Sequence, residues 1–145
     1  MSALGLVDTA TGAVFMIDAT PDFREQLHAL RSAAPGLPLA GLLLTHAHIG
    51  HYTGLIHLGY EAMATRGLPL YGTARMLGFL REHAPWKQLV ANGHVELIEL
   101  TPGVWRPLTP TASPYNSHAS PSSPTLNPRP TTASRAAPSI NNGLL

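Results

Sequence analysis

The apolar run at residues 39–44, Leu-Ala-Gly-Leu-Leu-Leu, constrains the fold of this chain more than any other segment. It follows the turn-forming stretch Pro35-Gly-Leu-Pro38, and it carries no charged or polar side chain. Six residues is the length of a strand, and an unbroken apolar run is typical of a strand covered on both faces. We therefore predict a buried strand here, in a sheet with further layers packed against it.

A helix is expected upstream of this strand. Thr20 is a good N-cap residue, and Pro21 suits the first position of a helix because its missing N–H would have no partner there. Phe23, Leu27 and Leu30 follow at helical spacing. They predict one apolar face, which would pack on the sheet.

The remaining segments continue an alternation of strands and helices. In chain order we predict strands at residues 4–8 and 13–17, the helix and the strand just described, a helix at 52–65, a strand at 68–71, a helix at 74–83 and a strand at 95–100. Gly12 ends the turn of an N-terminal hairpin, and Pro85 ends or bends the last helix. The order ββαβαβαβ predicts an α/β fold with helices against a sheet.

The composition changes sharply near Arg106. All eight acidic residues lie at or before Glu99, whereas Pro, Ser and Thr make up about half of residues 107–145. Such a segment buries too little apolar surface to offset the entropy lost on ordering. We therefore predict a domain at residues 1–106 and a disordered tail at residues 107–145. The tail is either a natural flexible extension or the product of a shifted coding frame.

Composition excludes several classes of function. The chain has no cysteine, so thiolate metal sites, disulfides and cysteine nucleophiles are ruled out. A net charge of +1 without a basic run gives no reason to expect nucleic acid as a partner. No apolar stretch is long enough to span a membrane, and the first residues lack the basic start of a signal peptide. We expect a soluble, cytoplasmic protein.

Three histidines directly follow the buried strand, in the sequence Thr45-His-Ala-His-Ile-Gly-His51. His46 and His48 are two residues apart, so an extended backbone directs both rings the same way. His51 arrives at the start of the next helix, close enough to reach the same pocket. The carboxyl ends of strands are where ligand sites form in open α/β sheets, and neutral imidazole is a good ligand for zinc and for iron. The pattern predicts a metal site; the alternative is three exposed loop histidines.

Thr45, His46, His48, His51 and Gly54 match the Thr-His-x-His-x-Asp-His-x-x-Gly signature of the metallo-β-lactamase superfamily, which this stretch resembles. The wider sequence is most similar to the branch related to pyrroloquinoline quinone biosynthesis protein B. The resemblance covers about residues 4–106. It implies the first half of an αβ/βα sandwich, followed here by the disordered tail, and so an incomplete copy of the domain.

The resemblance also implies roles for individual residues. His46 and His48 would bind the first metal ion, and His51 would face a second site. Asp18, at the end of the strand at residues 13–17, would support the metal loop from behind, since such a residue holds an imidazole's tautomer and direction. Otherwise Asp18 simply caps its strand. The expected metal is a single zinc ion, with iron or manganese as alternatives.

Two departures from the family pattern bear on activity. The family's metal-binding Asp is Gly50 here, which removes a carboxylate ligand of the second metal and the group that orients the attacking water. The family's remaining ligands come from a second half of the domain. His94 and His118 are the downstream candidates, and neither stands in the right sequence context, so the third ligand is left unassigned.

These observations predict a metal-dependent hydrolase that acts on an unknown small-molecule substrate and is impaired by truncation. A metal-bound hydroxide would attack a carbonyl or phosphoryl centre. The alternatives are a non-hydrolytic metal- or cofactor-binding protein and a non-functional fragment. Because one half of the sandwich would leave an apolar sheet face uncovered beside Leu42, Leu43 and Leu44, we also expect self-association through that face.

Overall fold

A computed structural model describes residues 3–110 of the chain. Residues 1, 2 and 111–145 lie outside this description, and with them His118 and nearly all of the tail predicted to be disordered. The disorder of the tail therefore stays a prediction, and His118 stays an untested candidate for the third ligand. Within the described range, no helix is long and apolar enough to cross a membrane.

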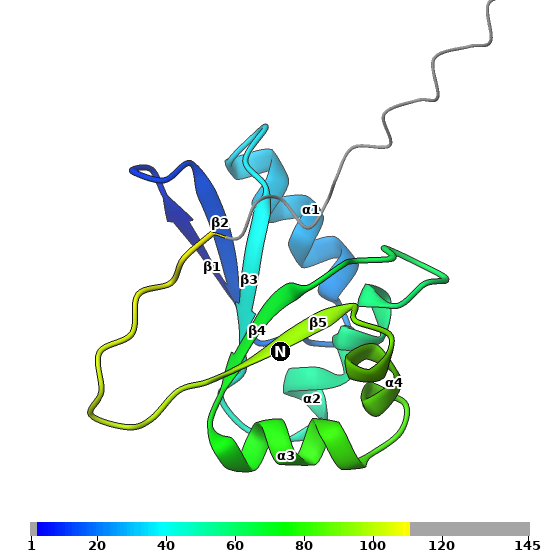
Figure 1. Ribbon diagram of the computed structural model, residues 1–145. Helices are drawn as coiled ribbons and strands as arrows, with labels where there is room; N and C mark the ends of the chain where they lie inside the picture. The colour runs from blue at the N-terminus through cyan, green and yellow to red at the C-terminus, as the bar shows by residue number, and fades with distance from the viewer. Residues whose placement is uncertain (1–2, 111–145) are drawn as a thin grey trace, which may run out of the picture.

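Five strands form one mixed sheet (Figure 1). The strands are β1 (Leu4–Asp8), β2 (Ala13–Ile17), β3 (Leu39–Leu43), β4 (Leu68–Gly72) and β5 (Val95–Glu99), and they lie side by side in this order. β1 pairs antiparallel with β2, as the hairpin prediction required, and all later neighbours pair in parallel. The carboxyl ends of β2, β3, β4 and β5 consequently lie along one edge of the sheet. The predicted α/β fold is confirmed.

The helices connect these strands and cover one face of the sheet (Figure 1). They are α1 (Phe23–Ala33), α2 (Ile49–Tyr52), the 3-10 helix η1 (Thr53–Leu58), α3 (Ala74–Glu82) and α4 (Trp86–Ala91). The predicted apolar face of α1 is confirmed, because Phe23, Leu27 and Leu30 are all buried. They enter a core that also contains Leu42 and Leu70 from the central strands.

The opposite face of the sheet carries a smaller apolar cluster. Phe15, Tyr71 and two alanines of β2 and β3 are buried there, with Leu43 and Leu108 packed against them. The segment after β5 loops outward and returns to this face, so that Leu108 reaches the cluster (Figure 1). The expectation for the three leucines at the end of the β3 run is therefore wrong in part. Leu42 and Leu44 are buried in the helix-side core, and only Leu43 faces the other way.

Two local predictions differ from the structure, and one helix was missed. The helix predicted at residues 52–65 is instead the short α2 and η1, which end at Leu58. Thr20 is not the N-cap of α1: Asp22 holds that position, while the Thr20 hydroxyl accepts from the Asp22 N–H at 3.2 Å. The helix α4 was not predicted, because its six residues are too few to show a period.

Candidate metal centre

The candidate site lies where β2 and β3 end side by side. Ile17, the last residue of β2, pairs with Leu43, the last residue of β3. Asp18 follows the first strand directly, and Thr45 and His46 follow the second after one more residue. The sheet register therefore brings together residues that are 27 positions apart in the chain.

The backbone around the site is held by a close approach of two segments. The Ala19 N–H donates to the carbonyl oxygen of His51, and the Gly54 N–H donates to the carbonyl oxygen of Ala19. A Cβ atom on Gly54 would lie 2.2 Å from the carbonyl oxygen of Thr20 and 2.6 Å from Cβ of Phe23. Only glycine fits this contact, which explains physically the Gly54 that the sequence pattern singled out. The contact fixes where His51 stands relative to the end of β2.

Asp18 is the centre of the hydrogen bonds that order the site. Its side chain is almost fully buried, and its backbone has a φ of 64°, a left-handed conformation that few residues other than Gly, Asn and Asp adopt. Oδ1 accepts from the N–H of Thr45 at 2.9 Å and from its hydroxyl at 2.9 Å. Oδ2 lies 2.8 Å from the same hydroxyl and 2.8 Å from Nδ1 of His51. Asp18 thus joins the loop after β3 to α2.

These contacts fix the positions of two ring protons. A carboxylate only accepts, so the single hydroxyl proton of Thr45 is directed at Asp18. The Thr45 oxygen also lies 2.9 Å from Nδ1 of His46, where it must then accept. Nδ1 of His46 therefore carries the proton, and Nε2 keeps its lone pair. His51 donates to Asp18 through Nδ1, which leaves Nε2 of His51 as its free lone pair as well.

The three rings lie together at the surface. Nε2 of His46 is 3.0 Å from Nδ1 of His48, and the ring centroids of His46 and His51 are 4.2 Å apart. The structure therefore brings His46, His48 and His51 into one cluster. Within residues 3–110, however, no three side chains of the metal-binding types are arranged so that they could hold an ion together.

The pair formed by His46 and His48 fits part of a zinc site. Two imidazole nitrogens bound to one tetrahedral zinc at about 2.0–2.1 Å would be about 3.3–3.4 Å apart. The observed 3.0 Å between Nε2 and Nδ1 is slightly shorter, because one proton now lies between the two nitrogens. A metal ion that replaced this proton would need the rings to separate by only a few tenths of an ångström. His51 stands beside the pair and does not complete it.

A cavity of about 450 Å³ opens beside the two histidines. Its other wall is the start of α3, where Thr73 caps the helix by accepting from the Met76 N–H at 3.4 Å. Arg75 and Phe79 also line the cavity. These residues of the α3 wall were not predicted from the sequence. The sequence feature that could have pointed to them is that residues 73–79 follow the carboxyl end of a parallel strand.

Aromatic side chains pack behind the site. Tyr52 is buried, and its ring centroid lies 5.2 Å from that of Phe79 and 4.7 Å from that of Trp86. Because Tyr52 directly follows His51, this packing ties α2 to α3 and α4. The cavity wall and the histidine loop are thereby held by one aromatic cluster.

The other histidines lie elsewhere. His57 stacks on Phe23 with centroids 6.2 Å apart. His94 precedes β5, so it stands at the start of the parallel strands, whereas the histidine cluster follows the end of β3. His94 is thus remote from the candidate site, in agreement with its not being assigned as a ligand.

Comparison with known proteins identifies the family. The chain is similar to a crystal structure of Zn(2+)-bound PqqB from Methylobacterium extorquens, with a TM-score of 0.55 and 22% sequence identity over 69% of this chain and 36% of that one. A crystal structure of a diphosphatase from the PhnP family gives a TM-score of 0.43 and 26% identity, over 62% of this chain and 34% of that one. The chain therefore spans about a third of the length of these two relatives. No curated protein sequence matches it significantly. Residues 14–135, well over half of the chain, match the family described as beta-lactamase superfamily domain, and the chain therefore belongs to that family.

Proposed function

We propose that this chain binds one divalent metal ion, zinc in the first place, through Nε2 of His46 and Nδ1 of His48, and that it is a metal-dependent hydrolase of its superfamily. The observation that carries the proposal is the 3.0 Å approach of these two nitrogens. The hydrogen bonds from Thr45 and Asp18 support it, since they place the proton of His46 on Nδ1 and leave a lone pair on Nε2. Zinc is the first choice because the similar PqqB structure is Zn(2+)-bound.

When bound, a zinc ion would supply a Lewis acid and a water of lowered pKa. The chain's own residues would do the rest. Asp18 and Thr45 keep the ring of His46 in one tautomer and one orientation. Arg75 lines the cavity beside the histidines and offers a fixed positive charge, which suits a substrate with an anionic group next to its carbonyl or phosphoryl centre. The cavity of about 450 Å³ is large enough for a small organic molecule.

A second candidate function is metal or cofactor binding without hydrolysis. Gly50 favours it, because the family pattern has a carboxylate at this position and glycine offers neither a ligand oxygen nor an acceptor for the attacking water. With two protein nitrogens on the ion, water would fill the remaining positions and the affinity would be modest. Turnover would then be absent even with metal bound.

Metal uptake by the full chain tests the shared part of both candidates. Equilibrium dialysis of the metal-free protein against zinc should give about one bound ion per chain. Iron(II) and manganese(II) should displace zinc no more readily than zinc displaces them. The double substitution His46→Ala and His48→Ala should abolish uptake, because it removes both proposed ligands. The control His28→Ala removes an exposed histidine of α1 that lies outside the cluster and its cavity, and it should leave uptake unchanged.

Activity then separates the two candidates. The zinc-loaded chain should hydrolyse at least one member of a panel of ester, thioester and phosphodiester substrates, and Arg75→Gln should raise KM most for the anionic ones. Zinc uptake without turnover of any of them would favour the non-hydrolytic function. Equal uptake by the wild-type chain and the double variant would contradict both, and would leave the non-functional fragment as the remaining interpretation.

A further inference from the structure

A second polar site surrounds His94, at the end of the sheet opposite to the histidine cluster. His94 is only 8% exposed, and its backbone is tied by bonds from its N–H to the Leu89 carbonyl oxygen at 2.9 Å and from the Leu68 N–H to its own carbonyl oxygen at 3.1 Å. Its Nδ1 lies 2.8 Å from the carbonyl oxygen of Thr65. Because a carbonyl only accepts, Nδ1 carries a proton, and in the neutral form of the ring Nε2 keeps a lone pair.

That lone pair has no donor among residues 3–110. The enclosed polar side-chain atoms that lack a partner in this range are Thr53 Oγ1 and Trp86 Nε1. Since Nε2 of His94 is not one of them, it reaches open space. A nearly buried histidine that lines a cavity and has an unpaired acceptor nitrogen offers an unfilled hydrogen-bonding position.

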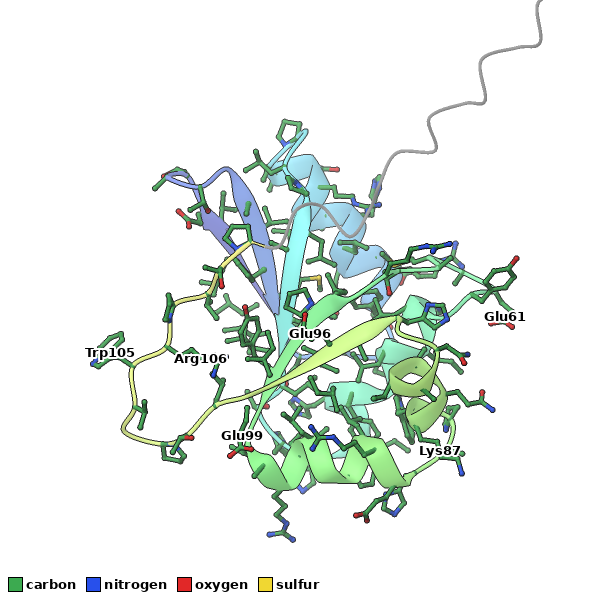
Figure 2. All side chains as sticks on the ribbon, in the orientation of Figure 1. Glu61, Lys87, Glu96, Glu99, Trp105 and Arg106 are labelled. Atoms are coloured by element: carbon green, nitrogen blue, oxygen red, sulfur yellow. The ribbon has the colours of Figure 1, made fainter. Side chains whose placement is uncertain are left out.

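Two cavities meet at this position, of about 210 Å³ and about 410 Å³. Tyr60, Asn92 and His94 line both of them. The smaller cavity adds the carboxylate of Glu61 and no Lys or Arg side chain, whereas the larger one adds Arg66 and no carboxylate, so only the smaller cavity carries a negative charge. Glu61 forms no ion pair within the described part of the chain. It stands on the connection from η1 to β4, on the side of the molecule away from Trp105 (Figure 2).

From this arrangement we propose that the smaller cavity binds the primary ammonium group of a small amine. An ammonium group has three N–H donors, which Nε2 of His94, the carboxylate of Glu61 and the side-chain oxygen of Asn92 would accept. The ring of Tyr60 adds a π face, which attracts cations. The single formal charge in this cavity complements a cation and disfavours an anion. The site does not depend on the metal centre, because the two stand at opposite ends of the parallel strands.

The test is an NMR titration of the full 145-residue chain with propylammonium chloride, followed at the ring nitrogens of His94. We expect a saturable shift of Nε2 in the millimolar range, as is usual for so small a ligand, and no such shift with potassium chloride at the same ionic strength. Propionate and propanol should bind at least tenfold more weakly, because neither brings a positive charge.

Glu61→Gln supplies the decisive variant, since Glu61 is exposed and its replacement should leave the fold intact. It should weaken propylammonium binding about tenfold, in line with the loss of a charged hydrogen bond. The control Glu82→Gln removes an exposed carboxylate on α3 and should change nothing. A linear shift without saturation, as for a position filled by water alone, would overturn the proposal. Equal binding of propionate, or of propylammonium to Glu61→Gln, would do the same.

Discussion

Asp18→Asn is the substitution that examines the architecture of the candidate centre most directly. Asparagine has the size of aspartate and tolerates the left-handed φ of 64° at this position, so the backbone needs no change. Its one oxygen can replace Oδ1 and keep the bond from the Thr45 N–H. Its NH₂ group then stands where Oδ2 now accepts from His51, and two donors would face each other.

The expected effects follow from this conflict. Losing one hydrogen bond to a buried carboxylate costs about 1.5–3 kcal/mol of unfolding free energy. For a folded part of about 100 residues, this corresponds to a fall in Tm of roughly 6–24 °C. To satisfy the amide, His51 would have to accept at Nδ1 and carry its proton at Nε2. The support of His46 through Thr45 would weaken too, so zinc affinity should fall about 10- to 100-fold.

Two measurements examine these expectations separately. Thermal and chemical unfolding of the metal-free chain report the loss of stability, and ¹⁵N NMR of the ring nitrogens reports the tautomer of His51. The control Asp22→Asn removes an exposed carboxylate four residues away and should shift neither. If Asp18→Asn unfolds within about 0.5 kcal/mol of the wild-type chain and keeps the Nδ1–H tautomer of His51, the reasoning is refuted.

Three further predictions concern other parts of the molecule. Gly54→Ala should lower the unfolding free energy by about 3 kcal/mol or more, because its Cβ would lie 2.2 Å from the Thr20 carbonyl oxygen; urea unfolding with an unchanged midpoint would contradict this. The pKa of the Asp8 carboxyl lies below its usual 3.8, chiefly because the Thr11 hydroxyl donates to it. The contribution of Asp8 to stability is therefore present above about pH 4 and lost as the pH falls through the lowered pKa. Thr11→Val should move the NMR titration midpoint of Asp8 upward. An unmoved midpoint would show that the Thr11 hydroxyl is not what lowers this pKa. The chain should self-associate through the sheet face opposite the helices. Trp105→Ser should weaken this association in sedimentation experiments, since Trp105 is 99% exposed beside that face and points away from the chain (Figure 2). A compact wild-type monomer at micromolar concentration would count against the prediction.

Local patterns in the sequence were sufficient for much of the fold. The apolar run at residues 39–44 became β3, with four of its five strand residues buried. The stripe of Phe23, Leu27 and Leu30 became the buried face of α1. Both succeed because side-chain periodicity depends only on neighbours within a few residues, and burial then follows from the hydrophobic effect.

The same local reasoning failed where tertiary contacts decide. Apolar spacing predicted one helix at residues 52–65, but the approach of Gly54 to Thr20 and the packing of Tyr52 shape this stretch into α2 and η1, which end at Leu58. A weak helical preference yields to such packing, since propensity is worth less than a kcal/mol per residue.

For the candidate site, too, the sequence predicted some features and the tertiary structure decided others. The sequence alone placed His46, His48 and His51 within six residues after a strand, and family resemblance added Asp18 as a supporting residue. The tertiary structure decided how they are connected: the parallel register of β2 and β3 sets Asp18 against Thr45, which is 27 residues away, and Thr45 in turn fixes the proton of His46. It also decided that Arg75 lines the cavity beside His48. A one-dimensional pattern carries the identity of such groups, whereas the direction of a hydrogen bond between distant segments exists only once the sheet has formed.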